Sequence, residues 1–160
     1  MLLTNQHPNN KSIMVGLAGL PNIGKSTLIN TLMGYELTAV THKPQTTRNH
    51  FHCASTIDHT EIIVVDTPGL HRSTKELNKR MNGQVRDGLD GTDLQLLMID
   101  LSQGLKEQFE TVQELYPQDF ERVWLVFTKS DLLKDISVFA FYQITEEVKK
   151  IFPSIERFFV

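Results

Sequence analysis

The residues of this chain with the clearest chemical meaning form a glycine-rich octapeptide, Gly19-Leu20-Pro21-Asn22-Ile23-Gly24-Lys25-Ser26. It matches the phosphate-binding pattern Gly-x-x-x-x-Gly-Lys-Ser/Thr at every fixed position. The glycines allow backbone amides to curl around phosphate groups, and a helix that begins there adds the positive end of its dipole. In such a loop Lys25 reaches the β- and γ-phosphates and the Ser26 hydroxyl binds Mg²⁺. We therefore predict a nucleoside-triphosphate site, with Thr27 as its last residue.

The residues on either side of the octapeptide have the patterns of a strand and a helix. Residues 13–18 are mostly apolar, as expected for a strand buried on both faces. Apolar residues then recur at helical spacing over residues 28–33, and Gly34 supplies a C-terminal stop. The alternative is a chance glycine turn, but strand, loop and helix in this order are the context that phosphate binding requires.

A second motif, Thr128-Lys129-Ser130-Asp131, follows the apolar residues 123–127, which we expect to form a buried strand. Ligands of open α/β sheets bind beyond the carboxyl ends of the strands. The Asp131 carboxylate can accept from N1–H and the 2-amino group of guanine, whereas adenine has an acceptor at N1 and no 2-amino group. The stem of Lys129 can lie along the base. A solvated turn would look the same in isolation; the phosphate loop makes guanine the favoured interpretation.

A third motif, Asp66-Thr67-Pro68-Gly69, follows the apolar residues 62–65. An aspartate at that strand end can hold the magnesium shell through water, and Gly69 leaves room for a backbone N–H to meet the γ-phosphate. The same four residues are also an ordinary turn sequence. Their position between the other two motifs favours a segment that senses the γ-phosphate.

Four stretches of the chain together resemble the Era family of translation-factor-like GTPases. They are residues 19–26, 43–48 (Lys-Pro-Gln-Thr-Thr-Arg), 66–70 and 128–131. The Pro-Asn pair in the phosphate loop and the Lys-Pro-Gln-Thr-Thr-Arg segment are the distinguishing marks. The resemblance extends from residue 12 to residue 160 and implies a GTPase domain whose first switch contains residues 43–48.

The resemblance also implies roles for individual residues. Thr47 would supply the second hydroxyl to Mg²⁺ in the GTP state, and the catalytic residues would be Lys25, Asn22 and Thr47. A K⁺ ion would lie beside the phosphates, held by oxygen atoms of Asn22, Thr41, Lys43 and Thr46. The alternative for Asn22 is that it only shapes the loop by local hydrogen bonds.

Hydrolysis by this chain should be slow. Many GTPases place a glutamine directly after the Asp-x-x-Gly motif to orient the attacking water. This chain has Leu70 there, whose side chain cannot hydrogen-bond water. Turnover would then depend on charge neutralisation by Lys25, Mg²⁺ and a second cation.

The chain departs from the family pattern at two places. Thr128 stands where the family usually has asparagine, and a threonine can make fewer of the hydrogen bonds that tie the base site to the phosphate loop. The last predicted strand, residues 156–160, ends where the family places Ser-Ala-Lys, a closing helix and an RNA-binding KH domain. We interpret residues 11–160 as a truncated GTPase domain that follows a disordered tail, residues 1–10.

Composition is consistent with one globular domain. With 160 residues, 40% of them apolar, the chain can build a single core. A net charge of −3 argues against a basic nucleic-acid-binding face. The single Cys53 excludes an internal disulfide and suits a reducing cytosol. No apolar stretch approaches the length of a membrane span.

Hydrophobic periodicity predicts the arrangement of the elements. Residues 51–57 and 60–65 flank a two-residue connection and should form an antiparallel hairpin. Helices are expected over residues 77–89, 105–115 and 138–151, with a further strand at 94–99. Gly83 and Gly88 should soften the first of these helices. The predicted fold is α/β, a doubly wound and mostly parallel six-stranded sheet with one antiparallel edge strand, as in P-loop GTPase domains.

The function that these residues and the resemblance favour is a GTP-binding switch that hydrolyses GTP slowly and uses Mg²⁺. By resemblance, its partners would be the 30S ribosomal subunit and 16S rRNA, its role small-subunit assembly, and its location the cytoplasm, with peripheral membrane association possible. The alternative is a guanine-nucleotide-binding remnant or interaction module without significant turnover. The sequence leaves the oligomeric state open.

Overall fold

The computed structural model describes residues 10–34, 51–70, 76–116, 122–133, 137–155 and 157–160. The strands in these ranges are β1 (Lys11–Gly19), β2 (Phe51–Ile57), β3 (Thr60–Asp66), β4 (Leu94–Asp100), β5 (Val123–Thr128) and β6 (Phe158–Phe159). The α-helices are α1 (Lys25–Met33), α2 (Glu76–Leu89), α3 (Leu105–Leu115) and α4 (Val138–Ile151), and η2 (Ser130–Leu132) is a 3₁₀-helix. The tail predicted for residues 1–10 lies outside the described residues except for Asn10.

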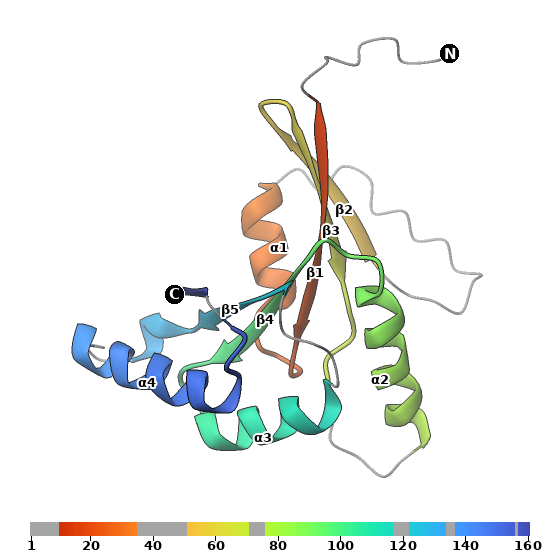
Figure 1. The fold of residues 1–160 in the computed structure, drawn as a ribbon. Coiled ribbons are helices and arrows are strands. Elements are labelled where there is room, and N and C mark those ends of the chain that lie inside the picture. Colours follow the sequence, from red (N-terminus) through yellow and green to blue (C-terminus); the bar gives the residue numbers. More distant parts are fainter. Residues whose placement is uncertain (1–9, 35–50, 71–75, 117–121, 134–136, 156) are drawn as a thin grey trace, which may run out of the picture.

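The six strands form one sheet in the order β2-β3-β1-β4-β5-β6 (Figure 1). Neighbouring strands are parallel except β2 and β3, which form an antiparallel hairpin. The predicted mostly parallel sheet with an antiparallel edge strand is confirmed. β1 lies between β3 and β4, so the strands that follow β1 in the sequence lie on both sides of it. In an open α/β sheet a ligand crevice forms at the carboxyl end of such a strand.

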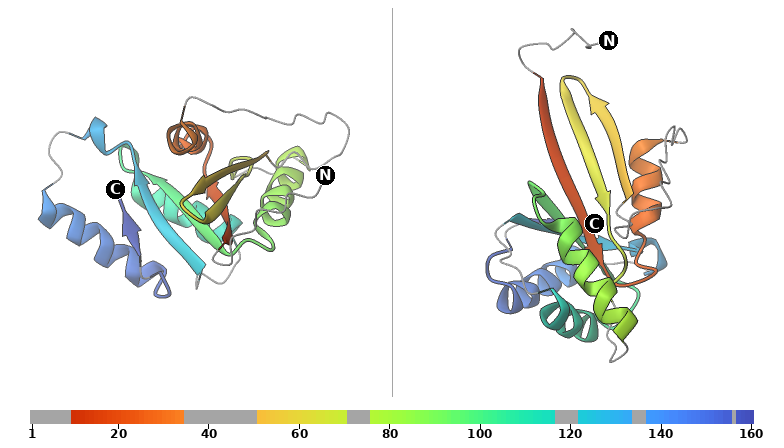
Figure 2. Two further views of the ribbon diagram at one scale, coloured as in Figure 1. Left: turned by 90° about the horizontal axis from the view of Figure 1, so that it is seen from above. Right: turned by 90° about the vertical axis from the view of Figure 1, so that its right-hand side faces the viewer.

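Helices cover both faces of the sheet (Figure 2). On one face α2, α3 and α4 bury the larger core cluster, whose strand residues include Ala18, Leu97 and Leu125. The rings of Phe109 and Phe152 meet edge to face within this cluster, with their centroids 5.9 Å apart. On the other face α1 packs on β1, β2 and β3 and buries a smaller cluster of Leu17, Ile29, Cys53 and Val64.

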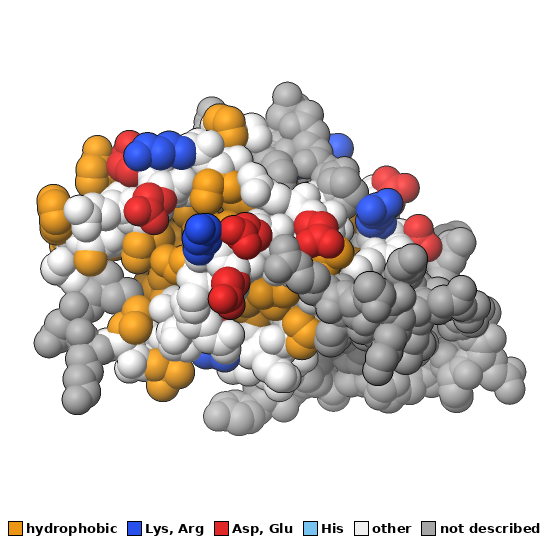
Figure 3. All heavy atoms as spheres, turned by 90° about the horizontal axis from the view of Figure 1, so that it is seen from below, with side chains coloured by type: hydrophobic (Ala, Val, Ile, Leu, Met, Phe, Trp, Pro, Cys, Tyr) orange, Lys and Arg blue, Asp and Glu red, His pale blue; other side chains and the backbone are white. Residues whose placement is uncertain are grey.

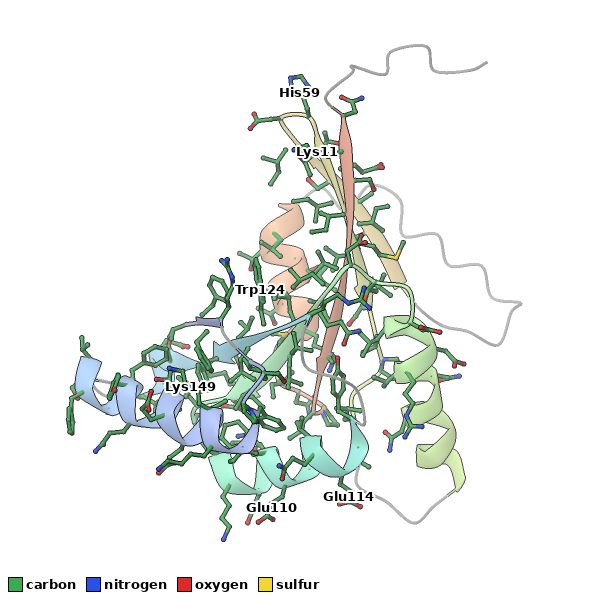
Figure 4. All side chains as sticks on the ribbon, viewed as in Figure 1. Lys11, His59, Glu110, Glu114, Trp124 and Lys149 are labelled. Atoms are coloured by element: carbon green, nitrogen blue, oxygen red, sulfur yellow. The ribbon has the colours of Figure 1, made fainter. Side chains whose placement is uncertain are left out.

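Two expectations about strands at the β6 edge were wrong. β5 is buried on one face only: Val123, Leu125 and Phe127 are buried, whereas Trp124 and Val126 are partly exposed. The reason is that α1 covers the β1–β3 end of its face and does not reach β5. Trp124 lies on this uncovered part of the sheet (Figure 4) and contacts the Phe159 ring at a centroid distance of 5.2 Å. The last strand is also shorter than predicted, since only residues 158 and 159 pair with β5.

The surface mixes charges of both signs. Viewed from the α3 side, acidic and basic side chains are scattered over the described surface, and hydrophobic side chains gather towards α4 (Figure 3). Val138, Phe139 and Tyr142 are the exposed hydrophobic residues of that helix. None of the helices in the described ranges combines the length and the apolar character that a membrane span requires.

Two glycines test the packing of α2 against β1. A Cβ at Gly83 would have no atom within 4 Å, so Gly83→Ala should raise the free energy of unfolding by about 0.5–1 kcal/mol. A Cβ at Gly16 would lie 2.5 Å from Leu89 Cδ2 and 3.2 Å from Thr92 Cγ2. Because both neighbours are buried, Gly16→Ala should lower that free energy by about 1–3 kcal/mol. Urea unfolding followed by circular dichroism measures both, and equal effects of the two substitutions would contradict this packing.

Candidate functional site

The predicted phosphate loop connects β1 to α1 through backbone conformations that favour glycine. Gly19 has φ 156° and Gly24 has φ 106°, and a Cβ at Gly19 would lie 2.9 Å from the Met98 carbonyl oxygen. Asn22 also has a positive φ, 59°, which asparagine tolerates better than most residues. Residues 22–27 line a pocket of about 350 Å³ at the N-terminus of α1. The N-terminus of α1 therefore borders this pocket, and a helix N-terminus favours a bound anion.

Lys25 is buried inside this loop. Its Nζ donates to the carbonyl oxygens of Gly19 (3.3 Å) and Leu20 (3.1 Å), and the residue is only 8% exposed. Burial lowers the pKa of Lys25, although the nearby Asp66 carboxylate opposes that shift. The ammonium therefore has weak, neutral partners, and phosphate oxygens would be stronger ones.

Asp66 ends β3 with a carboxylate that suits a cation. Its Oδ1 is buried and accepts no hydrogen bond from any described residue. Burial raises the pKa of Asp66, while Lys25 and a hydrogen bond from the Thr67 amide lower it. Ser26, whose hydroxyl was predicted to bind Mg²⁺, is exposed at the start of α1. A carboxylate oxygen without a partner and an available hydroxyl are the oxygen donors that Mg²⁺ prefers, so the described residues fit the predicted metal.

The Asp-Thr-Pro-Gly turn is attached to the phosphate loop. The Thr67 hydroxyl donates to the Leu17 carbonyl (2.6 Å), and the Leu70 amide donates to the Gly19 carbonyl (2.9 Å). A Cβ at Gly69 would lie 2.8 Å from the Pro21 backbone, so only glycine allows this approach. The Leu70 side chain is 1% exposed and packs in the larger core cluster. It points away from the site and cannot orient an attacking water.

The second motif is tied to the same loop through Thr128. Its hydroxyl lies 2.9 Å from the Ile23 carbonyl oxygen and 3.3 Å from that of Ile99, and its one proton can be donated to either. Threonine thus provides one link to the phosphate loop, in agreement with the expectation that it makes few such bonds. Lys129 follows with φ 59°, and Asp131 is exposed in η2.

One cavity of about 820 Å³ joins the two motifs. At one end it is lined by Ile23, Gly24, Thr27 and residues 128–131. It continues along the partly exposed face of the sheet over apolar residues that include Leu28, Leu96, Trp124 and Val126. The structure therefore places part of the phosphate loop beside residues 128–131 at the carboxyl ends of β1 and β5, whereas Lys25 and Ser26 line the adjoining pocket of residues 22–27.

Several predicted site residues lie outside the described part of the chain. They are the first-switch residues Thr41, Lys43, Thr46 and Thr47. Asn22 is described and exposed on the loop, but three of the four proposed K⁺ ligands are not described. The K⁺ site and the second magnesium hydroxyl stay predictions.

Two buried polar residues beside the base motif were missed from the sequence. Asp100, at the end of β4, is 2% exposed, and Gln108, in α3, is 4% exposed. Asp100 Oδ2 lies 2.7 Å from Lys129 Nζ. The signal that was available is an aspartate that directly closes the apolar strand β4, which comes one strand before the base motif along the chain.

Comparisons with known proteins agree with this geometry. Residues 14–129 match the model of a family described as 50S ribosome-binding GTPase. GTPase Era of Thermotoga petrophila is 39% identical over 122 residues, which are 76% of this chain and 41% of that protein. GTPase Era of Syntrophus aciditrophicus is 35% identical over 124 residues, 78% of this chain and 40% of that protein. The chain thus spans about two fifths of the length of these relatives.

Solved structures of Era share the fold. A crystal structure of Era in complex with MgGDPNP and nucleotides 1506–1542 of 16S ribosomal RNA superposes with a TM-score of 0.75 at 28% identity. It is matched over 94% of this chain and 50% of its own. Aquifex aeolicus Era bound to GDP and aluminium fluoride gives a TM-score of 0.73 at 29% identity, over 93% of this chain and 50% of its own.

Asp66→Asn tests the carboxylate as a metal-shell residue. A raised pKa means that the folded protein binds the Asp66 proton more tightly than the unfolded chain does, so the ionised carboxylate costs stability at neutral pH. In nucleotide-free protein the variant should therefore be as stable as wild type or more stable at pH 7. This difference should shrink as the pH falls through the raised pKa. Because Mg²⁺ needs the charge, its apparent affinity in the presence of GDP should fall roughly 10- to 100-fold.

Glu61→Gln is the matched control, since Glu61 is an exposed carboxylate on the same strand. Chemical denaturation at several pH values and magnesium titrations of GDP-bound protein measure the two effects. Unchanged magnesium dependence in Asp66→Asn would remove Asp66 from the metal shell.

Proposed function

This chain belongs to the GTPase family described as 50S ribosome-binding GTPases and carries a G domain of the Era type, and from this premise we propose that it is a guanine-nucleotide switch. It would bind GDP and GTP with Mg²⁺ and hydrolyse GTP slowly. The observation that carries this proposal is the cavity lined both by Ile23, Gly24 and Thr27 of the phosphate loop and by residues 128–131. A nucleotide needs both ends of such a space, because its phosphates and its base are recognised by different chemistry.

Guanine would be selected by Asp131. Its carboxylate is exposed in η2 at the end of the cavity, where it can accept from N1–H and the 2-amino group. Adenine would place an acceptor against the carboxylate and leave it without donors, which sites built for hydrogen bonding reject strongly. Lys129 lines the same cavity, and its stem would cover the face of the base.

The phosphates would be held by the loop amides and by Lys25. The Lys25 ammonium would exchange the carbonyls of Gly19 and Leu20 for β- and γ-phosphate oxygens, which are charged acceptors. Ser26 and Asp66 would hold Mg²⁺, with Thr47 joining them when GTP is bound. Bound Mg²⁺ would neutralise charge on the β- and γ-phosphate oxygens.

Slow hydrolysis follows from the position of Leu70. Its side chain is in the core, so it gives no group to the attacking water. We place a K⁺ ion beside Asn22, with Thr41, Lys43 and Thr46 as its other ligands, as the additional positive charge. The burial of Leu70 also favours the second candidate, a guanine-nucleotide-binding module without significant turnover. Phosphate release under single-turnover conditions separates the two functions.

The cellular role that we propose is assembly of the small ribosomal subunit in the cytoplasm. Its support is the similarity to Era, one structure of which contains 16S ribosomal RNA. This chain is matched to only half of that Era chain, so contact between this chain and RNA is itself proposed. Sedimentation with 30S subunits in GTP and in GDP tests it.

Asp131→Asn should change the base preference. The amide can donate to the 2-keto group of xanthine, which a carboxylate would repel, so affinity should move from GDP towards XDP. Calorimetric titrations of wild type and variant with GDP and XDP measure the change, which we expect to reach roughly 100-fold in the ratio of the two affinities. An unchanged preference for GDP would remove Asp131 from the base site. If GDP does not raise the melting temperature of wild type, the chain binds no guanine nucleotide.

Hydrolysis should depend on potassium. K⁺ suits a cage of neutral oxygens that replace its hydration shell, whereas Na⁺ is too small to reach all of them. Single-turnover phosphate release should be roughly tenfold or more faster in K⁺ than in Na⁺ at equal ionic strength. Asn22→Ala should abolish the difference. Measurable turnover at equal rates in both salts would contradict the cation site.

A further inference from the structure

Beyond the base-recognition motif itself, we propose that Asp100 positions Lys129, so that the lysine stem forms a fixed wall of the base site before nucleotide binds. This inference rests on the proposed guanine-nucleotide function. Asp100 ends β4 and pairs in register with Thr128 at the end of β5. Its Oδ2 lies 2.7 Å from Lys129 Nζ, and the two side chains are 3% and 30% exposed, respectively. The interior of the protein therefore holds the charged end of the lysine.

The Asp100 carboxylate is itself fixed. Its Oδ1 accepts hydrogen bonds from the Ser102 amide (2.8 Å) and the Ser102 hydroxyl (2.6 Å). Gln108 clamps the backbone of the same residue, because its Oε1 accepts from the Asp100 amide (2.9 Å) and its Nε2 donates to the Asp100 carbonyl (2.7 Å). Oδ1 and both backbone groups of Asp100 are thus hydrogen-bonded, and Oδ2 forms the ion pair with Lys129.

The charge on Asp100 persists at neutral pH. Burial raises the pKa of this carboxyl, but the hydrogen bonds from Lys129 and Ser102 outweigh burial and hold the pKa below its usual range. Because the group is ionised, its pair with the ammonium is charge-assisted, which is stronger than a neutral hydrogen bond.

Lys129 is constrained from its backbone as well. It has φ 59°, a left-handed conformation that is unusual for a lysine, and it is the N-terminal cap of η2. The backbone fixes one end of the side chain and Asp100 fixes the other. Lys129 lines the cavity together with Ser130 and Asp131. Ordering a long side chain normally reduces affinity, and here the ordering precedes binding.

A purely structural role explains this pair less well. Buried ion pairs contribute little net stability compared with apolar residues of similar volume. Lys129 lies in the base motif and Asp100 lies beneath it, so the pair is located where its rigidity would affect the nucleotide.

A double-mutant cycle on wild-type background tests the proposal, with GDP and IDP as ligands. Asp100→Asn retains an acceptor for Ser102 and removes the charge that holds Lys129. We expect it to weaken GDP binding roughly tenfold. IDP lacks the 2-amino group, so the ratio of GDP to IDP affinity reports the Asp131 contact. A lysine stem touches both bases equally, and this ratio should stay at the wild-type value.

Energetic coupling between Asp100→Asn and Lys129→Met, together with a matched control, distinguishes positioning of the lysine from a general loss of structure. In the Lys129→Met background, Asp100→Asn should cause little further loss of GDP affinity, because its effect passes through the lysine. Ser102→Ala removes a hydrogen bond to Oδ1 and leaves the Oδ2–Lys129 pair, and it should change GDP affinity less than threefold. Full additivity, wild-type affinity in Asp100→Asn, or a collapsed GDP-to-IDP ratio would each overturn the inference.

A measurement on the wild-type protein tests the inference even if the Asp100→Asn variant does not fold. The two Hε protons of Lys129 should have distinct NMR shifts in nucleotide-free protein, as in a held side chain, and a single averaged signal would overturn the inference. Failure of wild type to bind GDP would instead overturn the proposed function, and this inference with it. Normal wild-type binding with no effect of Asp100→Asn would overturn the inference alone.

Discussion

Two backbone carbonyls of the phosphate loop accept hydrogen bonds from the other two described motifs, and the arrangement of the described site depends on these bonds. The Gly19 carbonyl accepts from the Leu70 amide, and the Ile23 carbonyl accepts from the Thr128 hydroxyl. Thr67 reaches the same strand through the Leu17 carbonyl. The described loop is therefore held in place through its backbone acceptors. In the function that we propose, a change at the γ-phosphate would reach residues 66–70 through these bonds.

Two charged groups at the loop, those of Lys25 and Asp66, have no strong hydrogen-bond partners among the described residues. Lys25 is buried against neutral carbonyls, and one oxygen of Asp66 has no hydrogen-bond donor among the described residues. Burial lowers the pKa of Lys25 and raises the pKa of Asp66, so it favours the uncharged form of each group. Such opposed, partly buried charges reduce stability unless anionic and cationic ligands complete them, which is common at functional sites. Asp100 contrasts with Asp66, because every polar group of Asp100 has a partner. In our proposals, Asp66 serves the Mg²⁺ shell and Asp100 positions Lys129.

Sequence reasoning was sufficient for the fold because periodicity and glycine positions report local structure. The six strands, their order of appearance and the antiparallel hairpin follow from residues 51–65 and from the apolar runs. It failed for features that depend on contacts between elements far apart in the sequence. An apolar run such as residues 123–127 does not reveal that one of its faces lacks a helix. Asp100 stands out in the sequence only as an aspartate that closes an apolar strand, and its contacts with Gln108 and Lys129 depend on the adjacency of β4, β5 and α3. The burial of Leu70 in the core and the hydrogen bond from Thr128 to the Ile23 carbonyl became known only from the structure.

The central claim is that the phosphate loop and the base motif act as one site because they are tied together. Amide chemical shifts of ¹⁵N-labelled protein during titration with MgGDP, compared with MgADP, test it most directly. Signals of residues 22–27 and 129–131 should shift together with MgGDP and fit a single dissociation constant. MgADP at the same concentrations should leave both groups of signals in place. Movement of only one group, or equal shifts with MgGDP and MgADP, would contradict the claim.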